Sequence, residues 1–108
     1  MTGKDFRSLV LQFSGAIESE HMQHPDFRCR GRVFATLDYR DKGWAMVKLT
    51  PFQRRSYLRR APGVFQPASG AWGKSGSTVI QLNMAQKTIV KAALSAAFKN
   101  VPASHKIA

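Results

Sequence analysis

The residues with the clearest chemistry are four arginines close together in the chain with no acid among them: Arg54, Arg55, Arg59 and Arg60. Guanidinium groups at such spacing repel one another unless anions are near. Phosphate suits them well, because a guanidinium donates two parallel hydrogen bonds to it. Further along the chain Lys74 follows Trp72, whose indole can stack on a base. These residues predict a surface that contacts nucleic-acid phosphates, with DNA as the expected partner.

The charge of the chain is strongly one-sided. Its 108 residues carry a formal charge of +11. All six acids lie within the first 41 residues, where six Lys and Arg side chains balance them, and from Lys42 onward there are seven Lys, four Arg and no acid. Charge of a single sign disfavours compactness and attracts polyanions from solution. The alternative interpretation is that the charge serves solubility alone.

A second set of residues indicates a pocket for a small molecule. His24, Asp26 and Arg28 lie close together in the chain, and Trp72 is flanked by glycines. Convergent polar groups beside an aromatic wall are typical of ligand pockets. An anionic metabolite on an open sheet face is therefore the alternative function, and a protein-interaction adaptor that uses the same face is a further one.

Metal binding and catalysis find less support in the sequence. His21, His24 and Cys29 are suitable zinc ligands, but a closed structural site wants four. A Cys29–His24 nucleophilic pair would need a lowered thiol pKa, which the nearby Arg28 and Arg30 could provide. Strand alternation, however, points these two arginines to the face opposite Cys29. Gly73-Lys74-Ser75 lacks the glycine that a phosphate loop requires five residues earlier. The sequence predicts no catalytic residues, no metal and no cofactor.

The elements that must position these residues follow from apolar spacing and from turn residues. Phe6, Leu9, Val10 and Phe13 share one helical face, and Thr2 with Asp5 forms a capping box before it. Strands are expected at 27–30, 32–37, 44–49, 64–66 and 78–82, loops at 18–25, 38–43 and 67–77, and further helices at 51–60 and after Asn83. Thr50 and Pro51 mark the start of the second helix.

This order, α-βββ-α-ββ-α, predicts an α+β two-layer domain. An antiparallel sheet carries the helices on one face and leaves the other face partly open. We expect one domain over 1–102 and a flexible tail over 103–108. The single Cys29 cannot form an internal disulfide, and no apolar run approaches the ~18 residues of a membrane span. A cytoplasmic protein is expected.

The chain resembles the MmcQ/YjbR-like family from about Asp5 to Val101. The matching segments are Gly15 and Glu18, then 21–28, 31–37 and 43–51, and later Phe65, Trp72-Gly73, Gly76 and 79–82. The resemblance implies a secretion-chaperone-like or frataxin-like fold. It also implies DNA binding by paired wings that clasp a duplex, here the loops 38–43 and 67–77. The acidic helix with which frataxins bind iron has no counterpart in this chain.

Overall fold

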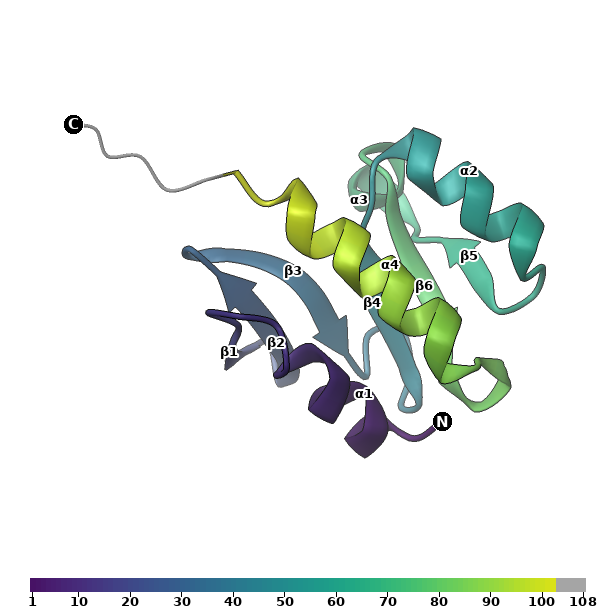
Figure 1. Cartoon of the computed structure of the whole chain (residues 1–108). Coiled ribbons are helices and arrows are strands. Elements are labelled where there is room, and N and C mark those ends of the chain that lie inside the picture. Colours follow the sequence, from purple (N-terminus) through teal and green to yellow (C-terminus); the bar gives the residue numbers. More distant parts are fainter. Residues whose placement is uncertain (103–108) are drawn as a thin grey trace.

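The structure is a computed structural model that describes residues 1–102; the predicted flexible tail over 103–108 lies outside the described residues (Figure 1). Its elements are α1 (Gly3–Val10), β1 (Ile17–His21), β2 (His24–Cys29), β3 (Arg32–Leu37), β4 (Trp44–Lys48), α2 (Pro51–Arg60), β5 (Phe65–Pro67), α3 (Gly70–Lys74), β6 (Ser77–Gln81), the 3₁₀ turn η1 (Leu82–Met84) and α4 (Lys87–Asn100). No helix among residues 1–102 is long and apolar enough to cross a bilayer.

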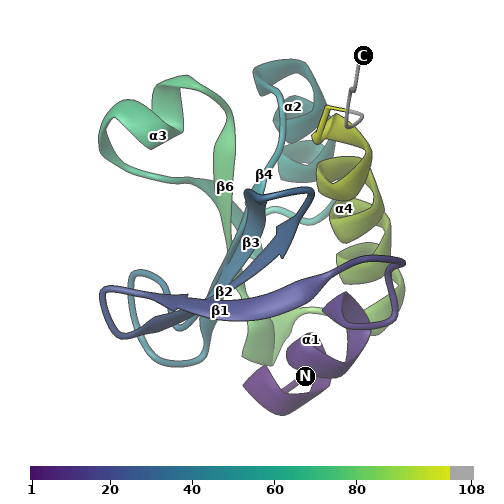
Figure 2. The same cartoon turned by 90° about the vertical axis from the view of Figure 1, so that its left-hand side faces the viewer.

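The six strands form one antiparallel sheet in the order β1-β2-β3-β4-β6-β5. Helices α1, α4 and α2 cover one face (Figure 1), and the short α3 stands on the other (Figure 2). The predicted α+β two-layer fold is confirmed. The additional helix α3 partly covers the face that we expected to be open, so this face becomes a hollow rather than a flat surface.

The main core lies between the sheet and the three longer helices. Phe6 of α1 and Phe27 of β2 are fully buried and meet edge to face, with ring centroids 6.1 Å apart. Phe34, Ile80 and Leu94 belong to the same cluster. Burial of each such side chain stabilises the fold by roughly 1.5–3 kcal/mol. Most of the stabilising burial therefore lies on the helix-covered face of the sheet. Polar residues on the other face are then not needed for the main core and can serve a binding site.

The N-caps predicted at Thr2 and Thr50 are present, whereas the one predicted at Asn83 is not. The hydroxyl of Thr50 accepts from the Gln53 N–H, the Gln53 side chain accepts from the Thr50 N–H, and Pro51 takes the first helical position. Thr2 and Asp5 form the same reciprocal pair at α1. These caps satisfy N–H groups that have no partner inside the helix. They explain why both helices start where the sequence predicts.

The capping box of α1 lowers the pKa of the Asp5 carboxyl group. The Thr2 backbone N–H donates to the Asp5 carboxylate, and this bond, followed by the Thr2 hydroxyl, holds the pKa of Asp5 below its usual 3.8. A lowered pKa means that the stabilisation is present above pH ~4 and is lost as the pH falls through the folded-state pKa. Carbon-detected NMR titration of Asp5 should show this low pKa, and Thr2→Val should raise it. An unchanged Asp5 pKa in Thr2→Val would contradict the assignment.

Three expectations about local structure were wrong. The segment 18–25 is not a loop, because Ile17–His21 pairs with His24–Cys29 in a hairpin. Its two-residue turn places Met22 and Gln23 at φ of 50° and 69°, the geometry that usually selects Asn-Gly, so Met-Gln does not indicate a turn. The loop 67–77 contains α3. Asn83 lies in η1, and α4 begins after Gln86 with no side-chain cap.

Candidate functional site

The residues of β2 that we selected lie on one face of the sheet. His24, Asp26 and Arg28 are two residues apart, and successive strand residues alternate between faces. Phe27 and Cys29 point into the helix-covered core. The three polar side chains therefore face the hollow under α3. Because Cys29 and His24 lie on opposite faces of the sheet, they do not form a nucleophilic pair.

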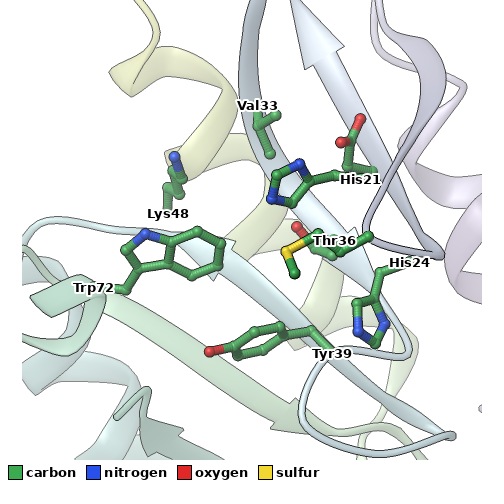
Figure 3. A pocket seen from close by; sticks show the side chains of 9 residues that line it. His21, His24, Val33, Thr36, Tyr39, Lys48 and Trp72 are labelled. Atoms are coloured by element: carbon green, nitrogen blue, oxygen red, sulfur yellow. The ribbon is translucent and has the colours of Figure 1, made fainter. Parts of the chain in front are cut away.

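A cavity of about 440 Å³ occupies this face (Figure 3). It is lined by His21, Met22, His24, Asp26, Val33, Thr36, Tyr39, Lys48 and Trp72. Three segments distant in sequence supply its walls, namely the β1–β2 hairpin, the strands β3 and β4, and α3. Its volume is within the range of small-molecule sites, which also combine apolar walls with a few polar groups.

Trp72 and Tyr39 form the aromatic wall of the cavity. Their ring centroids are 5.4 Å apart with the planes tilted by 33°, and Trp72 keeps 38% of its surface exposed. The ammonium of Lys48 lies 5.5 Å from the centroid of the Trp72 ring, so Lys48 is held beside the indole by a cation–π interaction. His24 in turn meets the edge of Tyr39 at 6.2 Å. The position of Trp72 is therefore fixed by contacts with Tyr39 and Lys48, and that of Tyr39 by His24.

Asp26 is fully buried at this face and is neutralised by Arg28. The Arg28 Nε and Nη2 donate to the two carboxylate oxygens of Asp26 at 2.9 and 3.1 Å. The hydrogen bond to Asp26 raises the pKa of Arg28, so the guanidinium stays charged. Arg28 therefore orients Asp26 instead of lining the cavity itself, which changes the role that we predicted for it.

One polar atom of the site has no partner. The Nδ1 atom of His24 is buried, and no group in residues 1–102 hydrogen-bonds to it. Buried polar atoms are almost always paired, because an unmade hydrogen bond costs about 1–3 kcal/mol. His24 lines the cavity but Nδ1 itself is closed off, so a ligand reaches this nitrogen only when the imidazole ring turns toward the cavity.

A register shift opposite Phe27 and Arg28 shapes the floor of the cavity. Phe27 pairs with Ala35, whereas Arg28 pairs with Val33, so β3 contains one extra residue at this point. Val33 and Thr36 are three residues apart and would face opposite sides of a regular strand, yet both line the cavity. Sequence patterns do not reveal such a bulge, which explains why we missed these two residues.

Tyr39, Lys48, His21 and Met22 are the other cavity residues that the sequence analysis did not assign to the pocket. Tyr39 and Lys48 lie at the ends of strands whose alternation was visible, but only the placement of α3 brings Trp72 to them. His21 was weighed as a zinc ligand. Among residues 1–102, no three His, Cys, Asp or Glu side chains gather closely enough to hold a metal ion.

The four arginines of α2 do not share one role. Arg54 is half-buried, and its Nη1 donates to the carbonyl oxygens of Gly73 and Ser77 at 2.6 and 3.1 Å. This corrects the prediction that Arg54 points outward to phosphate. Arg55, Arg59 and Arg60 are exposed. The predicted basic helix is therefore correct in its bounds, but one of its cations holds α2 to the segment that carries α3.

The exposed arginines lie in the same layer as the lysines of α4. Gln53 at the start of α2 hydrogen-bonds to Asn100 at the end of α4, and the two helices lie over the same face of the sheet (Figure 1). The exposed cations of this layer are Arg55, Arg59, Arg60, Lys87, Lys91 and Lys99. Within the described chain no carboxylate is in ion-pair distance of them, since the ion pairs are Arg7–Glu18 and Arg28–Asp26.

The sheet order keeps the acidic and the acid-free parts of the chain apart. Strands β1 to β3 follow one another from one edge, and the acid-free part supplies β4, β6 and β5 toward the other. Glu18 and Glu20 lie on the exposed edge strand β1. The one-sided charge of the sequence is therefore also one-sided across the molecule.

The two loops expected to act as wings meet each other. Tyr39 belongs to the loop 38–43 and Trp72 to the segment 67–77, and their rings are in contact. Because α3 stands on the face opposite α4 (Figure 2), Trp72 and Lys74 do not belong to the layer of exposed arginines. The predicted nucleic-acid residues are thus divided between two faces.

Comparison with known proteins supports the fold. No protein-family model and no curated protein sequence matches the chain. Its structure is similar to the crystal structure of protein DR2400 from Deinococcus radiodurans, which contains the family domain DUF419. The TM-score is 0.73 and the sequence identity 17%, over 90% of this chain and 75% of that one. At this identity the similarity shows a shared fold.

Proposed function

We propose that this chain is an MmcQ/YjbR-like, non-catalytic DNA-binding protein that contacts phosphates through the outer surface of α2 and α4. One observation carries the proposal: two adjacent helices expose cations from a part of the chain without acids. The shared fold with a DUF419 protein supports the family, because that domain is related to the MmcQ/YjbR-like fold. A surface of this charge attracts a polyanion.

The spacing on α2 suits a phosphate backbone. Arg55 and Arg59 are four residues apart and lie on one side of the helix, and Phe52, three residues earlier, is 78% exposed on the same side. Two guanidiniums can then hold phosphates while the ring rests on a sugar or base. Such contacts fix the position of a protein on DNA without reading its sequence. The proposal is therefore one of binding without strong sequence preference.

Binding of a labelled DNA duplex over a range of salt concentrations tests the proposal. Each phosphate contact contributes about 0.9 to the slope of log K against log salt. The variant Arg55→Ala/Arg59→Ala/Arg60→Ala should therefore bind more weakly at low salt and show a slope shallower by about 2.7 than the wild type. Fluorescence anisotropy measures both quantities.

A matched control removes three exposed cations from elsewhere: Lys4→Ala/Arg32→Ala/Lys42→Ala. This variant loses the same net charge, so a specific surface on α2 predicts little change in slope. If both variants lower the slope equally, the attraction is a property of net charge and the proposed surface is wrong. Absence of wild-type binding near physiological salt would also refute DNA binding.

A further inference from the structure

We propose that the cavity on the open face binds a nucleotide, either a free nucleoside monophosphate or an unpaired residue of a single strand. The site lies on the opposite side of the sheet from α2 and α4 (Figure 2) and shares no residue with the proposed duplex surface. It is therefore independent of that function. The inference rests on three features of the cavity, namely its ring faces, its unpaired cation and its unsatisfied nitrogen.

The ring faces explain why the ligand is a planar aromatic. Figure 3 shows Trp72 on one side of the hollow and His21 across from it, with Tyr39 below. Tyr39 supports Trp72 at 5.4 Å, so the indole is kept upright while over a third of its surface stays exposed. A base that enters between Trp72 and His21 has an aromatic surface on each side. Stacking of this kind accepts any base.

The cation explains why the ligand carries an anionic group. Lys48 lies at the rim beside Trp72 in Figure 3, and within residues 1–102 it has no carboxylate in ion-pair distance. The one carboxylate among the lining residues, Asp26, is already occupied by both hydrogen bonds from Arg28. The cavity therefore has an uncompensated positive charge next to its ring site, where a 5′-phosphate attached to a stacked base would lie.

The unsatisfied nitrogen explains why the ring is a heteroaromatic. His24 lines the cavity, and its Nδ1 is buried without a hydrogen-bond partner. An imidazole nitrogen can donate or accept depending on its tautomer, so once the ring turns toward the cavity it pairs with the polar edge of a base. A benzene ring of equal size would leave it unpaired. A ligand with a planar aromatic ring, a phosphate and a polar ring edge would match all three features of the cavity, and a nucleotide has these three parts.

Calorimetric titration with adenosine monophosphate, adenosine and ribose 5-phosphate separates the contributions. We expect adenosine monophosphate to bind and adenosine, which lacks the charged contact, to bind about tenfold more weakly. Ribose 5-phosphate should bind weakest, because it lacks both the stacking on Trp72 and the polar edge that pairs with His24. Trp72→Ala should weaken adenosine monophosphate about tenfold, whereas Trp72→Phe keeps most of the affinity. Lys48→Gln should weaken adenosine monophosphate and leave adenosine unchanged.

Lys74→Gln is the matched control, because Lys74 lies on α3 but outside the cavity and its removal should leave the affinity unchanged. Competition with oligothymidine identifies the source of the ligand. If the strand binds through Trp72 and the free nucleotide does not, the natural ligand is single-stranded nucleic acid, and the reverse result indicates a free nucleotide.

The proposal is overturned if ribose 5-phosphate binds as tightly as adenosine monophosphate, or if Trp72→Ala and Lys48→Gln, both folded by circular dichroism, bind every probe like the wild type. The Arg55→Ala/Arg59→Ala/Arg60→Ala variant should retain its affinity for adenosine monophosphate. Failure of duplex binding and failure of this site are therefore distinguished in the same set of proteins.

Discussion

Gly76→Ala is expected to destabilise the fold by about 3 kcal/mol, because the added methyl group combines backbone strain with a steric clash. Gly76 has a φ of +109°, where other residues are strained. A Cβ there would also lie 2.6 Å from the Thr50 carbonyl carbon and 2.7 Å from the Pro51 nitrogen, and it would overlap the Leu49 oxygen. All three are backbone atoms, which cannot move aside without displacing the start of α2.

Chemical denaturation of the variant checks this expectation, and Gly31→Ala is its control. Gly31 has a φ of +79° but no atom within 4 Å of an added Cβ, so it tests backbone strain alone. We expect a loss of about 1–2 kcal/mol for Gly31→Ala. Equal losses at the two glycines would show that the close approach of β6 to α2 contributes nothing.

Arg54→Ala is expected to cost about 2 kcal/mol, whereas Arg55→Ala should leave the stability nearly unchanged. The Arg54 guanidinium bonds to two carbonyl oxygens, on Gly73 and Ser77, and both residues are buried. Its removal leaves each carbonyl with its backbone donor alone, the Gly76 N–H for Gly73 and the Ala68 N–H for Ser77, and a lost hydrogen bond to a charged group costs about 1.5–3 kcal/mol. Arg55 is exposed.

Thermal unfolding of the two single variants, which have the same net charge, provides the comparison. A further readout is the salt slope of DNA binding, which should be the same for Arg54→Ala as for the wild type if Arg54 contacts no phosphate. Nearly equal melting temperatures for the two variants would contradict the internal role of Arg54. If Arg54→Ala binds DNA more weakly, the salt slope shows the cause. A shallower slope means a lost phosphate contact, whereas an unchanged slope means that α3 has been displaced.

The layers and most elements of the fold could be predicted because their signals are local. Thr50 and Pro51 mark a helix start by hydrogen bonding and by a fixed φ, and Phe6, Leu9 and Val10 show helical spacing. The strand β1 was missed for the opposite reason. It is an edge strand with all five residues exposed, so it has no apolar alternation, and its turn uses residues that rarely adopt positive φ.

The site was predictable only in part. His24 and Asp26 were selected as polar groups for a pocket and glycines around Trp72 indicated an unusual segment, but the strand was expected only from Phe27, so the shared face of His24 and Asp26 was not predicted. The cavity itself depends on contacts between segments that are far apart in sequence, such as Tyr39 with Trp72, and on the bulge that brings Val33 beside Thr36. The role of Arg54 likewise depends on where a chain segment 19 residues later passes.

The sheet order has a consequence for how the molecule moves toward a partner. Because β1 to β3 lie at one side of the sheet and the acid-free elements at the other, the centre of positive charge is displaced from the centre of mass. A body of this kind has a large electric dipole. In the field of a polyanion it experiences a torque that turns the edge of α2 and β5 forward before any contact forms. On the proposed function the molecule would therefore reach DNA already oriented, and added salt would weaken that orientation together with the attraction.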